Sequence, residues 1–385
     1  MINSFELFSG AGGLAKGIEL AGANHVGFVE WDKDACNTLR TNYKKDIIHE
    51  VDIREFDFST LNNVDIIAGG PPCQPFSLGG KHKGNEDNRD MFPYAINGIR
   101  SLRPKAFIFE NVKGLLRKTF SSYFNYIILQ LTYPELTQKK NQEWYDHLSE
   151  LEKIHTKGDF KGLKYNIVYR LINAADYGIP QKRERVVIVG IRSDINKSWS
   201  FPEYTHSEDS LNWDKYVTNK YFDLHKIKLS KEEKLRGEKI RQQLVNKYGF
   251  FEPNKNSWVT IRDVLSDLPE PTKRGEFHKE HTLRTGARVY PGHTGSDIDE
   301  PAKTIKAGGH GVPGGENMIR FRNGSVRYFT TFEAKRIQTF PDNYLITGSW
   351  TEAMRQIGNA VPVRLGEVIS NSIFSNVFTG QSRVN

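Results

Sequence analysis

The sequence predicts an α/β protein with a mixed, mainly parallel sheet and a second, smaller, loop-rich domain. Through the first ~110 residues, short apolar segments alternate with helix-like segments, which is typical of parallel strands covered by helices on both faces. From about residue 193 this rhythm gives way to charged sequence and then to Gly-, His- and Arg-rich sequence. We expect a larger domain over 1–192 plus about 352–385, and a smaller one over about 193–351.

The expected elements follow the chain in order. A Gly-rich turn and a helix to about Ala21 follow the first strand, and a helical insertion at about 115–160 interrupts the sheet pattern. A segment at 327–341 reads as an amphipathic helix with a capping box formed by Thr330 and Glu333. Two further helices are expected over 35–42 and 230–247, and a final helix is expected to begin at 358. The expected strands are 5–8, 25–29, 47–51, 64–68, 106–109, 165–170 and 185–190.

Composition limits the classes of function. The chain has 54 Lys and Arg against 46 Asp and Glu, a net charge of +8 that fits a polyanionic partner without requiring one. No apolar run reaches 18 residues and no basic leader precedes the first strand, so we expect neither a membrane span nor a signal peptide. Two cysteines are too few for a disulfide framework or a zinc cage, which favours a reducing, cytoplasmic location and no metal.

A glycine-rich turn follows the first strand. Residues 10–15 fit the pattern G-x-G-x-x-A, which lets the backbone approach a ligand at a helix N-terminus. Glu30 ends the second strand 20 residues after Gly10, where a carboxylate can accept both hydroxyls of an adenosine ribose. These residues leave open a nicotinamide cofactor or a tight strand–helix turn without a ligand.

Cys73 lies in a proline-rich loop after a buried strand. Pro71, Pro72 and Pro75 surround it, and prolines fix φ and stiffen the chain. The carboxyl end of such a strand is where open α/β sheets bind ligands, so a nucleophile is the leading interpretation. A small buried hydrophobic residue is the alternative.

Two further segments carry charged side chains that could take part in catalysis or binding. Glu110 follows another strand and could share the sheet edge with Cys73, which favours acid or base work over a solvated strand end. The segment 181–185 holds Lys182, Arg183 and Arg185, and its guanidinium groups suit phosphate or a polar base edge, although a solvated charge run is equally compatible.

Taken together and in order, these segments resemble the DNA (cytosine-5)-methyltransferases, of the prokaryotic restriction–modification type. The resemblance covers the whole length of the chain and implies a Rossmann-like methyltransferase fold using S-adenosylmethionine (AdoMet), with S-adenosylhomocysteine as product and no metal. The matching segments are residues 8–14, 70–74, 110–112, 181–185, 327–341 and 358–359. Two features depart from the family pattern, namely Phe329 in place of a leucine and the insertion at 115–160, which has no inherited role.

The resemblance implies a cofactor site at the strand ends. Phe8 would stack on the adenine, Glu30 would bind the ribose hydroxyls, Trp31 would lie against the cofactor and Asp52 would meet the adenine amino group. The complete implied set is Phe8, Ser9, Gly10, Ala11, Gly12, Gly13, Glu30, Trp31, Asp52, Ile53, Pro72, Phe92 and Asn359.

The resemblance also gives the catalytic residues their roles. Cytosine C5 becomes nucleophilic when a thiolate adds at C6, so Cys73 would form a covalent adduct. Glu110 would share a proton with N3, and Arg185 would hold O2. Arg185 and the sulfonium of AdoMet would supply the positive charge that a thiol of pKa about 8.5 needs. Arg183 completes the expected catalytic set. The base that removes the C5 proton is not identified.

Duplex DNA is the implied partner, with the target cytosine flipped out of the stack. Residues 76–90 suit a loop that closes over the base, and 193–326 would read the sequence. The predicted DNA-binding residues are Gln74, Ser77, Lys81, Lys83, Arg284, Arg288, Thr304, His310, Arg320 and Arg322. We expect a monomer with a separately acting restriction endonuclease as possible partner; a tRNA methyltransferase and a non-catalytic DNA-binding relative are the competing interpretations.

Overall fold

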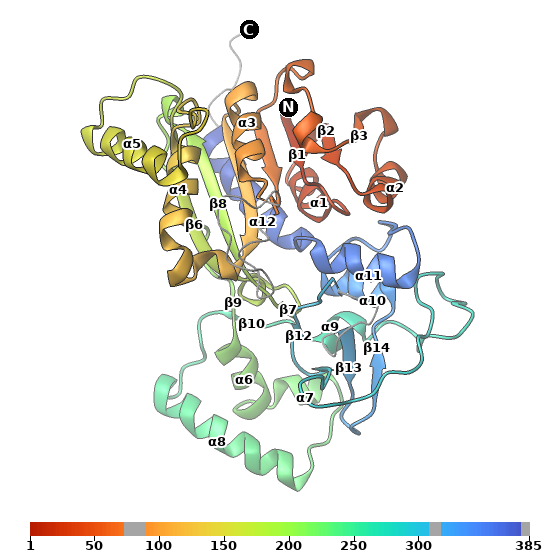
Figure 1. Ribbon diagram of the computed structural model, residues 1–385. Helices are drawn as coiled ribbons and strands as arrows, with labels where there is room; N and C mark the ends of the chain where they lie inside the picture. Colours follow the sequence, from red (N-terminus) through yellow and green to blue (C-terminus); the bar gives the residue numbers. More distant parts are fainter. Residues whose placement is uncertain (73–89, 308–316, 379–385) are drawn as a thin grey trace. The chain divides into compact units, whose positions relative to one another are not determined.

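The computed structural model describes residues 1–72, 90–307 and 317–378 (Figure 1). The chain forms two compact units. The first contains Met1–Ile172, Glu184–Pro202 and Asn343–Asn385, and the second contains Asn173–Arg183 and Glu203–Asp342. The second unit is therefore built from two separate stretches of chain, and the shorter stretch precedes the predicted boundary at 193. The functions given to the two predicted domains stay predictions.

A seven-stranded sheet with the order β3-β2-β1-β4-β5-β8-β6 forms the centre of the first unit. The pairs β1–β2, β2–β3, β1–β4 and β4–β5 are parallel, whereas β5 and β8 are antiparallel. The prediction of a mixed, mainly parallel sheet is confirmed. The strands are β1 (Ile2–Leu7), β2 (Ala23–Glu30), β3 (Ile48–Glu50), β4 (Ile66–Gly69), β5 (Ala106–Val112), β6 (Tyr165–Asn173) and β8 (Glu184–Arg192).

Both faces of this sheet are covered, as the apolar strands predict. Consecutive residues of β2 belong to different apolar clusters, because side chains alternate across a strand. Phe28 packs with Cys36 and Leu39, and Val29 packs with the larger cluster that contains Phe107. The helices are α1 (Gly13–Leu20), α2 (Lys33–Asn42), α3 (Phe92–Leu102), α4 (Ser121–Thr132), α5 (Trp144–Lys157), α11 (Trp350–Asn359) and α12 (Val363–Ile373).

Helices α4 and α5 form the predicted helical insertion. Helix α4 buries Tyr126 and Ile127 in the large apolar cluster, and α5 adds Leu151 to the same cluster. The ring of His147 on α5 is hydrogen-bonded to the hydroxyl of Tyr126 at 2.9 Å. The insertion therefore belongs to the core of the first unit.

The second unit contains short strands and helices joined by long connections. Its helix α10 is shorter than the predicted 327–341, because Arg327 and Tyr328 lie in strand β14, paired with β13. The capping box of Thr330 and Glu333 is confirmed. The elements are β7 (Gln181–Lys182), β9 (His206–Ser207), α6 (Glu208–Tyr216), α7 (Lys220–Leu224), α8 (Lys231–Tyr248), β10 (Asn256–Ser257), α9 (Ile261–Leu265), β11 (Ser296–Asp297), β12 (Ala302–Lys303), β13 (Met318–Arg320), β14 (Val326–Tyr328) and α10 (Thr331–Ile337).

Within the described residues, every helix is too short or too polar to cross a membrane.

Candidate active site

The carboxyl ends of the parallel strands bring the predicted site residues to one edge of the sheet. In the sheet, β2 and β3 lie on one side of β1, and β4 and β5 lie on the other, so the order of the strands switches between β1 and β4. Open α/β sheets bind ligands at such a switch point. The turn after β1 holds the glycine loop and the turn after β4 leads to Pro71. Because β8 is antiparallel to β5, its first residues lie at the same edge as the end of β5.

The glycine loop has the backbone that its sequence predicts. Gly10 and Gly12 have φ values of 52° and 79°, in the left-handed region where a side chain is strained. Phe8 also has a positive φ of 52°, which is uncommon for a bulky residue, and backbone strain of this kind clusters at functional sites. A Cβ built on Gly10 would have no atom within 4 Å, so this side of the loop faces open space.

Glu30 ties the glycine loop to the start of α2. Its Oε2 accepts a hydrogen bond from the Gly10 N–H at 2.7 Å, and its Oε1 accepts from the N–H groups of Trp31 and Asp32, each at 2.9 Å. Burial raises the pKa of Glu30, and the three N–H donors oppose that shift. The carboxylate keeps free acceptor capacity for the hydroxyls of a ribose.

The other predicted cofactor residues lie in different environments. Trp31 is 75% exposed, and Asn359 is exposed at the end of α11. The Asp52 carboxylate accepts hydrogen bonds from Arg54, which lower the pKa of Asp52, and Ile53 is buried beside it. Phe92 is fully buried and packs edge-on against Phe109, so in this conformation it offers no surface to a ligand.

Glu110 and Arg185 form an ion pair at the same sheet edge. In the antiparallel register Glu110 lies opposite Val187, two residues from Arg185, so both side chains leave the same face as diagonal neighbours. Nε of Arg185 lies 2.7 Å from Oε1 of Glu110, and both side chains are less than 15% exposed. Nη1 of Arg185 also donates to the carbonyl of Glu184 at 2.8 Å.

Asn111, the residue after Glu110, holds the chain that leads to Cys73. Its Nδ2 donates to the carbonyl of Pro71 at 2.9 Å, and the carbonyl of Pro72 accepts from the N–H of Met91 at 3.1 Å. Proline has no N–H, so these carbonyls are the backbone groups available to anchor the segment. Cys73, Gln74, Ser77, Lys81, Lys83 and His310 lie outside the described residues.

Arg183 makes its described contacts within the second unit. It belongs to the second unit, is 1% exposed, and donates from Nη1 to the carbonyl of Ile305 at 3.3 Å. In the same unit, the amide oxygen of Gln181 accepts from the N–H of Ile305 at 3.2 Å. The two arginines are separated because the chain passes from β7 to β8, and thus from one unit to the other, between them. Arg183 thus supports the 304–305 segment, and its predicted catalytic role stays a prediction.

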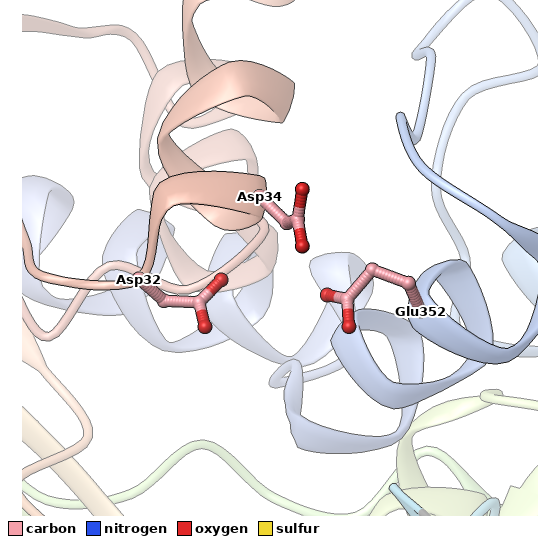
Figure 2. Close-up of side chains that lie close together, drawn as sticks. All are labelled: Asp32, Asp34 and Glu352. Atoms are coloured by element: carbon pink, nitrogen blue, oxygen red, sulfur yellow. The ribbon is translucent and has the colours of Figure 1, made fainter. Parts of the chain in front are cut away.

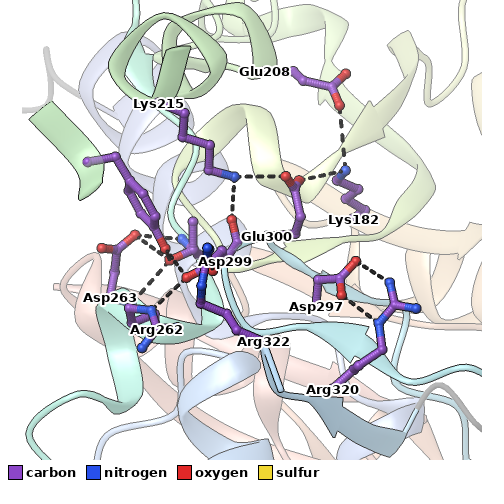
Figure 3. Close-up of polar contacts among 12 residues, drawn as sticks. Lys182, Glu208, Lys215, Arg262, Asp263, Asp297, Asp299, Glu300, Arg320 and Arg322 are labelled. Carbon is purple, nitrogen blue, oxygen red and sulfur yellow. Dashed lines mark hydrogen bonds and ion pairs between the residues drawn. The ribbon is translucent and has the colours of Figure 1, made fainter. Parts of the chain in front are cut away.

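Several predicted DNA-binding residues are engaged within the second unit (Figure 3). Arg320 pairs with both oxygens of Asp297 at 2.6 Å, and Arg322 donates to Asp299 at 2.9 Å. The hydroxyl of Thr304 donates to the carbonyl of Lys182 at 2.8 Å. These partners occupy part of the donor capacity of each guanidinium and hold its position.

Arg284 and Arg288 are both exposed. Arg288 forms no ion pair with another described residue. The guanidinium of Arg288 is therefore accessible to an external acceptor.

Three carboxylates gather where α2 begins near α11 (Figure 2). Asp32, Asp34 and Glu352 have oxygens within 4.8 Å of one another. Arg355 donates to Asp32 at 2.8 Å and to Glu352 at 2.7 Å, so a guanidinium already balances part of this charge. We assign no function to this cluster.

The site and sheet together define a class. The arrangement is that of an AdoMet-dependent methyltransferase of Rossmann-like fold. It has a glycine loop after β1, the Glu30 carboxylate at the end of β2 and the Glu110 carboxyl group near the end of β5. Residues 2–133 and 136–375 match the family model of C-5 cytosine-specific DNA methylases. The chain belongs to this family and is a DNA (cytosine-5)-methyltransferase.

Curated Type II methyltransferases match this chain over most of their length. The chain is 32% identical to the Type II methyltransferase M.PspPI of Psychrobacter, over 96% of this chain and 78% of that protein. It is 31% identical to the Type II methyltransferase M.NgoMIV of Neisseria gonorrhoeae, over 96% of each chain. The solved structure of S. pombe Dnmt2 methyltransferase matches 97% of this chain with a TM-score of 0.58 at 16% identity, which supports the fold.

The family implies AdoMet, and the residues present fit it. The open side of Gly10 gives the cofactor close access to the loop backbone, and Glu30 offers acceptors beside it. Trp31 presents an exposed indole next to Glu30. These groups match an adenosine with a neutral ribose, which needs acceptors and an aromatic surface.

Proposed function

We propose that the protein transfers a methyl group from AdoMet to C5 of a cytosine flipped out of duplex DNA, through a covalent bond between Cys73 and C6. The observation that carries the proposal is the Glu110–Arg185 pair next to the Pro71 anchor. The anchored segment continues directly into Cys73, so the sheet edge would hold a nucleophile, an acid and a cation within one site.

The chain's own groups would act in sequence. The Cys73 thiolate adds to C6, and the electron pair of the C5–C6 double bond moves into the ring as N3 takes a proton shared with Glu110. AdoMet, held by the glycine loop and Glu30, would supply an electrophilic methyl group to C5, and the electron pair of the methyl–sulfur bond would leave with S-adenosylhomocysteine. A base would then remove the C5 proton, the electron pair of that C–H bond would restore the C5–C6 double bond and expel Cys73 as thiolate, and N3 would return its proton to Glu110.

Arg185 is suited to hold the cytosine O2. One of its N–H groups faces Glu110 and another donates to the Glu184 carbonyl, which leaves further donors of the guanidinium for a ligand. Arg185 can therefore bind O2 without leaving Glu110. It would also supply positive charge that favours the Cys73 thiolate.

The biological role follows from the relatives. M.PspPI and M.NgoMIV are Type II methyltransferases, so we infer that this chain protects DNA within a restriction–modification system, acting in the bacterial cytoplasm at the nucleoid. A separate endonuclease would be its partner in the system. The enzyme would act as a monomer, because one flipped cytosine needs one site.

The adduct can be tested with duplex DNA that contains 5-fluorocytosine. Fluorine at C5 cannot leave as the proton does, so the enzyme should stay covalently bound to this DNA in the presence of AdoMet and migrate as a larger species under denaturing conditions. Cys73→Ser should give no such species, while Cys36→Ser, a buried cysteine on α2, should give it in full. Adduct formation by Cys73→Ser would disprove the nucleophile assignment. Methyl transfer to tRNA rather than to DNA would show that the substrate is tRNA and would overturn the proposal of a DNA substrate.

A further inference from the structure

A short extended segment of the first unit supports the glycine loop from behind. Residues 344–347, here called the strap, lie at the start of the last stretch of the first unit, which begins at Asn343. Tyr344 is 3% exposed, and its hydroxyl donates to the carbonyl of Ala11 at 2.7 Å. The strap therefore contacts the loop that the cofactor would approach from its open side.

The hydroxyl of Tyr344 completes the pairing of one loop peptide. The Ala11–Gly12 peptide has its carbonyl bound to Tyr344 and its N–H bound to the carbonyl of Ser9 at 2.9 Å. With both polar groups paired, the plane of this peptide is fixed. Its orientation determines how Gly10 and the start of α1 are presented.

Space around Gly12 shows how closely Tyr344 packs. A Cβ built on Gly12 would lie 2.6 Å from the Tyr344 hydroxyl and 3.0 Å from Cδ2 of Leu39. The ring of Tyr344 also packs edge-on against Tyr43, with 6.2 Å between centroids. Burial raises the pKa of Tyr344, so the phenol stays protonated and remains a donor to Ala11.

The rest of the strap is fixed to α2 and α11. Asn42 donates to the carbonyl of Leu345 at 2.8 Å and accepts from its N–H at 3.0 Å. The hydroxyl of Thr38 accepts from the N–H of Thr347 at 3.0 Å, and Gln356 donates to the carbonyl of Thr347 at 3.1 Å. Tyr344 is thus held on a rigid support rather than on a free loop.

We propose that Tyr344 is a positioning residue for AdoMet, which fixes the Ala11–Gly12 peptide and thereby the cofactor-binding shape of the glycine loop. The proposal rests on the proposed function, because it assigns the loop to AdoMet. Tyr344 does not touch the cofactor; it acts through Ala11. Its removal should therefore weaken cofactor binding more than it affects the transfer step.

Tyr344→Phe removes only the hydroxyl, and the chain offers a matched control. Tyr165 is also fully buried in the first unit, and its hydroxyl donates to the carbonyl of Pro104 at 2.7 Å. Tyr165→Phe should therefore lower Tm to a similar extent without reaching the loop. S-adenosylhomocysteine binding is measured by calorimetry for wild type and both variants, and amide hydrogen exchange is followed at Gly12 and Gly13.

Tyr344→Phe should weaken S-adenosylhomocysteine binding roughly three- to tenfold, as expected for one buried hydrogen bond, and speed exchange at Gly12 and Gly13. The KM for AdoMet should rise in parallel while kcat changes little. Tyr165→Phe should bind like wild type. Equal affinity of the two variants and wild type would overturn the positioning role, whereas a wild-type protein that binds neither AdoMet nor its product would overturn the cofactor proposal itself.

Discussion

Gly10 and Gly12 both have positive φ, but only Gly10 has room for a side chain. Ala in the left-handed region costs about 1–2 kcal/mol, so Gly10→Ala should cost about that much. At Gly12 the added methyl group would also meet the Tyr344 hydroxyl at 2.6 Å, and such overpacking adds about 1–3 kcal/mol. Gly12→Ala should therefore cost about 2–5 kcal/mol in total.

Thermal unfolding distinguishes these two variants. At about 2–4 °C per kcal/mol for a unit of this size, Tm should fall by roughly 4–20 °C in Gly12→Ala and by roughly 2–8 °C in Gly10→Ala. Affinity for S-adenosylhomocysteine should show the complementary pattern. The methyl group of Gly10→Ala occupies the open side of the loop, so it should weaken binding at least tenfold in a protein that is close to wild type in stability.

The result that would refute this reasoning is specific. If Gly10→Ala lost as much Tm as Gly12→Ala, the difference in space around the two glycines would not exist in the protein. If Gly10→Ala bound S-adenosylhomocysteine like wild type, the open side of the loop would not be the cofactor side. Circular dichroism of both variants shows whether each is folded at the temperature of the binding measurement.

Two further predictions concern the second unit. Arg288→Ala should weaken binding to a methylatable DNA duplex by about 1–3 kcal/mol without changing Tm. Arg320→Ala should weaken it less and lower Tm, because Asp297 already takes two of the N–H donors of Arg320 and holds its guanidinium in place. Fluorescence anisotropy and thermal unfolding of both variants check this, and the reverse pattern would contradict it. Burial acts to raise the pKa of Asp299, but hydrogen bonds from Arg262 and Arg322 outweigh it and lower that pKa. A carboxyl group whose pKa is lowered by folding stabilises the protein above its unfolded pKa of about 4, and this effect is lost as the pH falls through the folded pKa. Asp299→Asn should therefore unfold at a lower urea concentration than wild type at about pH 7, and this difference in urea midpoint should close below about pH 4. A difference in midpoint that does not depend on pH would refute the assignment.

The sequence predicted the elements of the first unit better than their directions. Apolar segments of four to nine residues mark strands whichever way they run, so the pattern at 185–190 gave a strand but not its antiparallel pairing with β5. Direction is set by the route of the connecting chain, which leaves the sheet between β6 and β8 through the second unit. The same route explains why Arg183 and Arg185, two residues apart, serve different units.

The helix expected over 327–341 shows a second limit. Its capping box was readable because Thr330 and Glu333 act on each other locally. Arg327 and Tyr328 join β14 because β13 lies beside them, and that pairing is a tertiary contact. Asn111 is a similar case, since its partner Pro71 lies 40 residues away and no local signal links an asparagine to a proline carbonyl.

Exchange of the second unit between relatives by recombination is constrained, because this unit is built from two separate stretches of chain. Strand β7, from the short stretch, pairs with β12, from the long one, and Gln181 and Arg183 bind the backbone of Ile305 beyond that pairing. A recombination event that replaced only 203–342 with the segment of a relative would join a foreign β12 to the resident β7. Viable hybrids must therefore exchange both stretches together or share a compatible β7–β12 pair. New specificities should consequently arise more readily by substitution in the exposed connections, such as the one that carries Arg284 and Arg288, than by transfer of a single gene fragment.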